Sequence, residues 1–421
     1  MTSTDTRSAD IAAERGSGSK ATIWSLAFAG LLLAYFLVNL GLNMANNLST
    51  PYAKSLGATP VVMGIVATGF TYGSMVFKLV SGPAIDSFNR KWLLLGAVGI
   101  IGVAFIGDAF ATSVPVLITF RILQGVGQAF TATTFVALAA DTLSKEKMAS
   151  GMGVFALGTA GSTLLGAFVG LKIQEATSFR TAFLIAFVVL AVGFASVLFA
   201  PLRQTKSTKK FRISISGFIA KEALPPALMQ FLFMMAWSSV FAFLVVFGQE
   251  QGLGSNVGLF NTAYGFVVFF AAPLAGRLVD RFGYYMVLPM LALMATSLWL
   301  ISFSNNLGML IFAAVVGAFG YGAAGPVARS MAMSMVPKER RGAASSTLFV
   351  MSDIGQLVGP IVGGVFVSMF GYAVMFRIAP VWVLLAAILL VVTKRYVNRR
   401  IAAQTAAEDS AETTEAAPAK A

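Results

Sequence analysis

One carboxyl group in this chain stands in the middle of a long apolar segment. Asp353 lies about eleven residues into the run 343–370, and the other acids lie at the ends of apolar runs or outside them. Such a carboxyl is costly to bury and by default indicates a functional site. The chain has no histidine, so a proton that it moves must be carried by a carboxylate. Asp353 is therefore the predicted proton site; the alternative is an acid that hydrogen-bonds a neighbouring helix.

A second intramembrane charge begins the sequence Arg-Ile-Leu-Gln-Gly-Val-Gly-Gln at 121–128. Arg121 lies roughly 12 Å below the outer surface, at about 1.5 Å per residue. A guanidinium at that depth costs several kcal/mol unless it faces a wet cavity or a partner. Gln124 and Gln128 follow at i+3 and i+7 and share its helix face. We predict that Arg121 faces the same cavity as Asp353 and tunes its proton affinity; the alternative is snorkelling to the headgroups.

Other polar residues within apolar runs form a wider candidate set. Lys78 and Arg329 lie near the inner ends of their runs, and each is either functional or snorkels to the surface. The rest either contact the substrate or hydrogen-bond across helices. The predicted substrate-cavity residues are Asn39, Asn43, Tyr72, Gln124, Gln128, Gln230, Trp237, Asn261, Tyr264 and Gln356.

Twelve apolar runs carry these residues, and each is long enough to cross the hydrocarbon core, which needs about 20 residues. The sequence therefore predicts an all-α integral membrane protein. The runs are 22–45, 58–81, 92–112, 114–138, 148–171, 180–201, 224–248, 257–279, 284–303, 307–335, 343–370 and 373–393.

The chain contains an internal repeat with an offset of about 194 residues. Gly82-x-x-x-Asp86 returns as Gly276-x-x-x-Asp280, each in a short polar stretch between apolar runs. The offset recurs for Lys145-Glu146-Lys147 against Lys338-Glu339-Arg340, and for Gly125-x-Gly127 against Gly320-x-Gly322. Two homologous halves of six helices are typical of transporters whose halves rock around a central site.

Composition excludes several classes of protein. The chain is 57% hydrophobic and 11% charged, with a mean hydropathy of +0.81, whereas soluble domains are about 25% charged. The net charge of +13 is spread one loop at a time, which argues against a nucleic-acid surface. There is no cysteine, no phosphate-binding Gly-rich loop and no nucleophile or metal cluster. The sequence therefore predicts that the protein binds no metal or cofactor and is not an enzyme.

The basic residues predict the orientation. With both termini in the cytoplasm, 23 of the 30 Lys and Arg residues fall on the cytoplasmic side and 4 on the outer side. The predicted parts are a cytoplasmic tail at 1–21, a six-helix half at 22–201, a basic linker at 202–222, a second half at 223–393 and a disordered cytoplasmic tail at 394–421.

Over nearly its whole length, the chain resembles the major facilitator superfamily. The turn after the second run, with Gly82, Asp86, Arg90 and Lys91, is similar to the family signature, and its second copy keeps Gly276, Asp280 and Arg281. The resemblance implies a conformational latch. Its glycines let helices approach closely, and Asp86 pairs with basic residues across the cytoplasmic seam.

Arg121, Gln124 and Gly125 resemble the Arg-x-x-Gln-Gly motif of the drug:proton antiporter branch of that family. This implies a monomeric transporter of the bacterial inner membrane that works by alternating access on a proton gradient. We predict efflux of a small organic compound. The alternative is uptake or exchange of a small organic anion, favoured by Lys78, Arg121 and Arg329 against Asp353 alone. A receptor or scaffold on the same fold is the third class.

Overall fold

The structure, a computed structural model, describes residues 25–144, 147–202 and 219–416. Within these ranges the regular structure is helical, which confirms the predicted fold class. The first half consists of α2 (Leu26–Ser55), α3 (Pro60–Ser87), α4 (Arg90–Ala109), α5 (Val114–Thr142), α6 (Met148–Ala176) and α7 (Phe179–Phe199). The second half consists of α8 (Leu224–Glu250), α9 (Leu259–Phe282), α10 (Val287–Ser302), α11 (Leu307–Met333), α12 (Arg341–Phe370), α13 (Tyr372–Ile378) and α14 (Pro380–Ala416).

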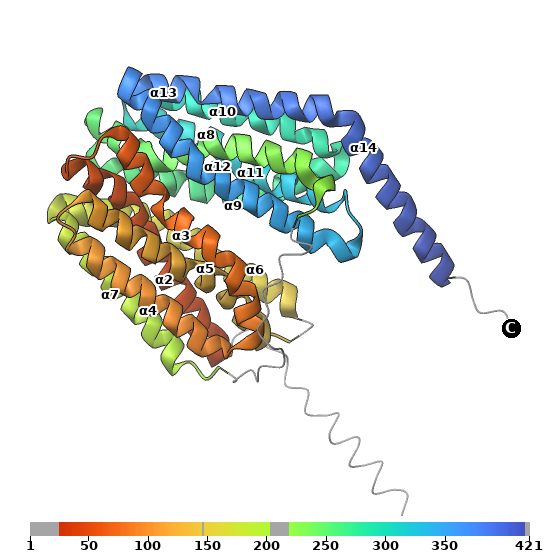
Figure 1. Ribbon diagram of the computed structural model, residues 1–421, viewed down its shortest axis with the longest axis horizontal. Coiled ribbons are helices and arrows are strands. Elements are labelled where there is room, and N and C mark those ends of the chain that lie inside the picture. Colours follow the sequence, from red (N-terminus) through yellow and green to blue (C-terminus); the bar gives the residue numbers. More distant parts are fainter. Residues whose placement is uncertain (1–24, 145–146, 203–218, 417–421) are drawn as a thin grey trace, which may run out of the picture.

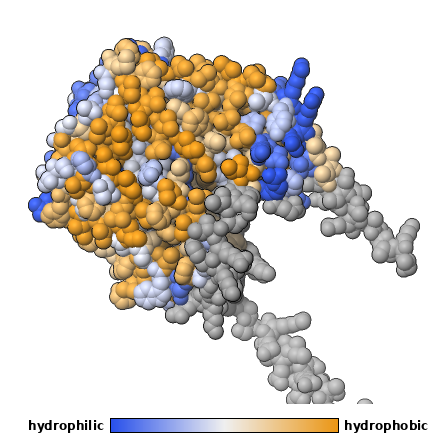
Figure 2. Space-filling view, viewed as in Figure 1, coloured by the Kyte–Doolittle hydropathy of each residue, from blue (hydrophilic) through white to orange (hydrophobic). Residues whose placement is uncertain are grey.

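The predicted number of membrane spans agrees with these helices. Eleven of the described helices are long and apolar enough to cross a membrane, and a pair bent by 41° within 254–282 brings the number to twelve. Large apolar side chains such as Trp92, Phe199 and Phe312 lie exposed on the outside of the bundle. Figure 2 shows apolar residues over much of the surface of both halves. Such a surface suits contact with lipid.

Local sequence sets several helix ends. The side chains of Ser25, Asn89, Ser178 and Asn306 accept hydrogen bonds from free backbone N–H groups in the first turns of α2, α4, α7 and α11. Gly371 ends α12 with a φ of 81°, a left-handed conformation that glycine adopts without strain.

The two halves touch along α3–α12 and α6–α9. The end of the bundle at which the following contacts lie is named the contact end. Lys54 forms an ion pair with Glu250 across the halves at 2.6 Å, and Thr262 donates to the carbonyl of Leu164 at 2.5 Å. A Cβ atom at Gly364 would overlap the backbone of Pro60. Small residues thus let the halves approach closely there.

The halves diverge at the other end, where the α3–α4 and α9–α10 turns lie; it is named the basic end (Figure 1). At Gly82 and Gly276 no atom lies within 4 Å of the position that a Cβ would occupy. The close helix approach expected at these glycines is therefore not made in this conformation. The two glycines also lie inside helices α3 and α9, whereas the sequence analysis expected them in the short polar stretches between helices.

The chain end differs from the sequence prediction. Helix α14 continues to Ala416, so the disordered tail predicted at 394–421 is wrong up to that residue. Alanine-rich sequence has a high helix propensity, and the helix above it removes the cost of nucleation. The predicted tail at 1–21, the repeat residues 145–146 and the linker core 203–218 lie outside the described residues.

Candidate transport cavity

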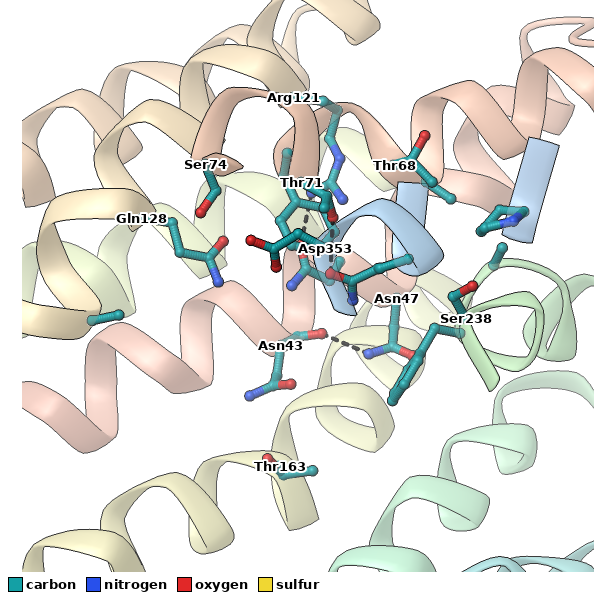
Figure 3. A pocket seen from close by; sticks show the side chains of 18 of the residues that line it. Asn43, Asn47, Thr68, Thr71, Ser74, Arg121, Gln128, Thr163, Ser238 and Asp353 are labelled. Atoms are coloured by element: carbon teal, nitrogen blue, oxygen red, sulfur yellow. Dashed lines mark hydrogen bonds between the residues drawn. The ribbon is translucent and has the colours of Figure 1, made fainter. Parts of the chain in front are cut away.

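A cavity of about 340 Å³ lies between the two halves, lined by α2, α3, α5, α6, α8, α9 and α12. Figure 3 shows side chains of both halves around it, among them Arg121 and Thr71 of the first half and Asp353 of the second. Most lining side chains are polar. Because both halves supply them, the wall of the cavity changes if the halves move.

The two halves are joined inside the cavity by an ion pair. Nζ of Lys78 on α3 donates to the two carboxylate oxygens of Asp353 on α12, at 2.9 and 2.7 Å. The Lys78 side chain is 40% exposed and that of Asp353 12% exposed. Lys78 therefore does not snorkel to the surface in this conformation; it faces the cavity and binds the predicted proton site.

Arg121 also lines the cavity, but amides rather than Asp353 bind it. Its Nη1 donates to Oδ1 of Asn46 at 2.8 Å and to Oε1 of Gln124 at 2.5 Å, and its Nε donates to the carbonyl of Val66 at 3.4 Å. The guanidinium carbon lies 5.0 Å from the ring centroid of Phe70. Arg121 and Asp353 thus line the same cavity, but the direct cationic partner of Asp353 is Lys78, so the role of Arg121 in tuning the proton site stays a prediction.

Glycines position this arginine. A Cβ at Gly125 would overlap the carbonyl oxygen of Phe70, and one at Gly73 would overlap that of Ile122. Helices α3 and α5 therefore approach closely, which brings the Val66 carbonyl within reach of Arg121. The glycine that follows Gln124 thus serves helix packing and indirectly orients the charge.

Amide side chains make further contacts between the halves. Nδ2 of Asn261 on α9 donates to Oδ1 of Asn47 on α2 at 3.2 Å. The hydroxyl of Thr71 on α3 donates to Oε1 of Gln356 on α12 at 3.1 Å. The sequence analysis missed Asn46 and Asn47 as site residues, although Asn47 follows Asn43 by one helical turn.

Four residues of the predicted substrate set line the cavity: Asn43, Gln128, Asn261 and Gln356. Six others do not: Asn39, Tyr72, Gln124, Gln230, Trp237 and Tyr264. Tyr72 is 51% exposed, so its place in the cavity is wrong. Trp237 is buried against Tyr321, with ring centroids 4.7 Å apart. The spacing of polar residues along a helix does not by itself determine which face of the helix lies against the cavity.

Gln124, Gln230 and Asn39 serve hydrogen bonding instead. Gln124 binds Arg121 and donates to Asn46 at 3.1 Å. Gln230 lies 3.5 Å from the hydroxyl of Ser352, and Asn39 donates to the carbonyl of Tyr35 at 2.8 Å. All three residues therefore hydrogen-bond within the helix bundle, which is the alternative to substrate contact given in the sequence analysis.

Asp108 is a second buried acid. It lies at the end of α4 with no exposed surface, and neither carboxyl oxygen has a hydrogen-bond partner among the described residues. The sequence placed it at an outer helix end, and the only signal of its burial was its apolar surroundings.

The residues of the predicted latch make contacts within one half. Arg90 forms an ion pair with Asp141 of α5 at 2.6 Å. Lys91 donates to the carbonyls of Leu198 and Ala200 at 2.9 Å each. These bonds fix the basic end of α4 against α5 and α7.

The remaining latch residues lie in the last turns of their helices, Asp86 in α3 and Asp280 and Arg281 in α9. Arg329 of α11 lies over the ring of Phe349 on α12 at 4.6 Å, also within one half.

Two features bear on the class of protein. Among the described residues, no group of three His, Cys, Asp or Glu side chains is placed to hold a metal ion. The polar groups of the cavity are amides, hydroxyls, the Arg121 guanidinium and one ion pair, a set suited to binding and releasing a solute.

Two relatives from bacteria are similar to the chain over most of its length. "Multi-drug resistance efflux pump PmrA" of Streptococcus pneumoniae is 25% identical over 329 residues, which are 74% of this chain and 81% of the relative. "Staphylopine export protein" of Staphylococcus aureus is 24% identical over 381 residues, covering 85% of this chain and 93% of the relative.

Solved structures share the fold. The nucleoside transporter NupG matches 89% of this chain and all of its own, with a TM-score of 0.75 and 13% identity. An inward-facing bacterial homolog of the human lysosomal transporter Spinster matches 91% of this chain and 99% of its own, with a TM-score of 0.72 and 15% identity. The family model "Major Facilitator Superfamily" matches residues 31–259 and 226–419. The chain belongs to the Major Facilitator Superfamily and is a membrane transporter rather than an enzyme.

Proposed function

We propose that the protein exports a small organic compound in exchange for protons by alternating access. The observation that carries this proposal is the Lys78–Asp353 ion pair, because it joins the two halves inside the cavity. The names of the two bacterial relatives, an efflux pump and an export protein, support the direction of transport. The whole cavity is built from one chain, which supports a monomer as the working unit.

Proton coupling follows from the chemistry of the pair. Protonation of Asp353 removes its negative charge, and the ionic attraction between α3 and α12 is then lost. A ligand shifts a conformational equilibrium only by its differential affinity for the two states. Asp353 and its partner Lys78 belong to different halves, so the distance between them changes with the conformation. The proton affinity of Asp353 then differs between the two conformations, which meets this condition.

The positive-inside rule favours a cytoplasmic position for the basic end, and the bacterial relatives support the inner membrane as the location. Because the halves diverge at that end, this conformation is the one that loads substrate from the cytoplasm (Figure 1). The contact end, with the Lys54–Glu250 pair, is then the closed outer gate.

The function is tested in everted membrane vesicles that contain the protein, with an imposed pH gradient that is acid inside. A panel of labelled organic compounds is expected to include one that accumulates inside only while the gradient is present. Vesicles from cells without the protein serve as the control. Accumulation that is unaffected by an uncoupler would contradict proton coupling.

Uptake or exchange of a small organic anion is the second candidate. It is favoured by the two cationic side chains of the cavity, Lys78 and Arg121, against the single acid Asp353. The same vesicles separate the two directions, because under the same acid-inside gradient a proton-coupled importer would release a preloaded compound, whereas the exporter would accumulate it.

The latch gives a separate prediction. If Asp86 pairs with basic residues across the seam when the basic end closes, Asp86→Asn should favour the conformation described here. Single cysteines introduced at Gly82 and at Thr59 report the two ends, since the natural chain has no cysteine. We expect faster thiol labelling at Gly82 and slower labelling at Thr59 in the Asp86→Asn background. Equal rates in both backgrounds would exclude the latch.

A further inference from the structure

The cavity wall indicates the chemistry of the substrate. Its apolar side chains come from three alanines, two phenylalanines and one proline, and all others are hydroxyl, amide or charged groups. One of the phenylalanines, Phe70, already lies under the guanidinium of Arg121. Lipophilic cations depend on free aromatic faces, and Phe241 is the one ring that the wall still offers. The cavity is therefore a poor site for that class of compound.

A ligand that carries both a positive and a negative charge can replace the ion pair in the cavity. Lys78 and Asp353 bind each other at 2.7 Å, and Lys78 is accessible from the cavity. A lone cation that takes Asp353 would leave Lys78 without its partner, and a lone anion that takes Lys78 would leave Asp353 without one. An unpaired charge is disfavoured most at Asp353, whose side chain is 12% exposed. A ligand with an ammonium and a carboxylate leaves both side chains paired.

We propose that the substrate is a small zwitterion with an amine and at least one carboxylate. Its carboxylate binds Lys78 and its ammonium binds Asp353, in place of the bond between the two side chains. This inference rests on the proposed transport function and names the substrate class of the same site.

Two further observations fit this class. Oε1 of Gln128 is buried with no hydrogen-bond partner among the described residues, although Gln128 lines the cavity. A buried acceptor without a donor is costly, and a ligand N–H group supplies one. The volume of about 340 Å³ is at the lower end of ligand pockets, which span about 300–1,000 Å³. It suits a compact polar molecule.

The charges also favour a second carboxylate. Lys78 and Arg121 face one acid, so an empty cavity with all three groups ionised carries an excess positive charge. An acidic zwitterion neutralises it. The ammonium and the coupling proton then compete for Asp353, so substrate and proton exclude each other, as antiport requires.

The test uses purified, full-length protein and four sets of probes. The first set contains the free amino acids and acidic dipeptides. The second contains the same compounds as carboxyl esters, the third their N-acetyl derivatives, and the fourth lipophilic monocations. Binding is read from the thermal unfolding midpoint in detergent. Transport is read from the loss of an imposed pH gradient in proteoliposomes when a probe is added.

At least one compound of the first set is expected to raise the unfolding midpoint and to dissipate the gradient. Its ester and its N-acetyl derivative should bind at least tenfold more weakly. Two variants give a crossed pattern. Lys78→Met should weaken binding of the free compound but not of its ester, and Asp353→Asn should weaken binding of the free compound but not of its N-acetyl derivative. Arg340→Met, which breaks the ion pair with Glu222 outside the cavity, is the matched control and should change none of these ratios.

The outcomes separate the two proposals. A response to lipophilic monocations alone would overturn the zwitterion and leave proton-coupled efflux standing. Binding of a zwitterion without any proton movement would support the substrate class and contradict the coupling. No binding by any member of the first set would overturn the inference.

Discussion

Asp353→Asn is expected to abolish accumulation of substrate against its gradient while downhill exchange continues. The amide cannot take up the coupling proton and forms no ionic bond to Lys78, so the contact between α3 and α12 no longer depends on pH. Substrate can still enter and leave as the halves move. Flux in proteoliposomes, with and without an imposed pH gradient, measures both rates. We expect the gradient to stimulate the wild-type protein and to have no effect on the variant.

The control for this variant is Glu222→Gln. It also removes one carboxylate from an ion pair, with Arg340 at 2.6 Å, but the pair lies within one half and outside the cavity. It should keep the response to the gradient. Both variants should unfold near the wild-type temperature, because a partly exposed ion pair contributes about 0–1 kcal/mol. If the Asp353→Asn protein still concentrates substrate, the proton is carried elsewhere or another ion drives transport.

Arg121→Ala is expected to impair both stability and transport, and Arg121→Lys to impair them less. The alanine leaves Oε1 of Gln124 without its donor, while Oδ1 of Asn46 still accepts from Gln124 and the Val66 carbonyl loses a long contact. A buried polar group left without a partner costs about 1–3 kcal/mol, and a loss of that size is expected. Lysine keeps the charge but cannot serve two acceptors with a planar fork. Unfolding in detergent and substrate flux provide the two measurements.

Arg180→Ala is the matched control for the arginine. Its guanidinium carbon also lies over a phenylalanine, 4.2 Å from the ring centroid of Phe110, but the side chain is exposed. Its loss should change stability by less than about 1 kcal/mol. A lysine variant as impaired as the alanine variant would contradict the expected benefit of the retained charge. A lysine variant equal to the wild-type protein would show that the fork geometry on Asn46 and Gln124 is unimportant.

The candidate site was only partly predictable from the sequence. Asp353 and Arg121 were found because a charge inside an apolar run is expensive and therefore rare. The roles of the Asn and Gln side chains were harder to predict, because these amides hydrogen-bond equally well to a helix backbone, to a neighbouring helix or to a solute. Asn43 lines the cavity while Asn39, one turn away, does not. Tyr72 lies among cavity residues in the sequence, between Thr71 and Ser74, yet points outward.

The sequence by itself determined the all-α membrane fold, the twelve spans and the two related halves. These properties follow from hydrophobic length and internal repetition, which are one-dimensional and need no partner. The tertiary structure alone decided that Lys78 binds Asp353 and that Arg121 binds Asn46 and Gln124. The ion pair joins residues 275 positions apart in the chain. Such a contact depends on how two separately folded halves face each other, and no local pattern carries that information.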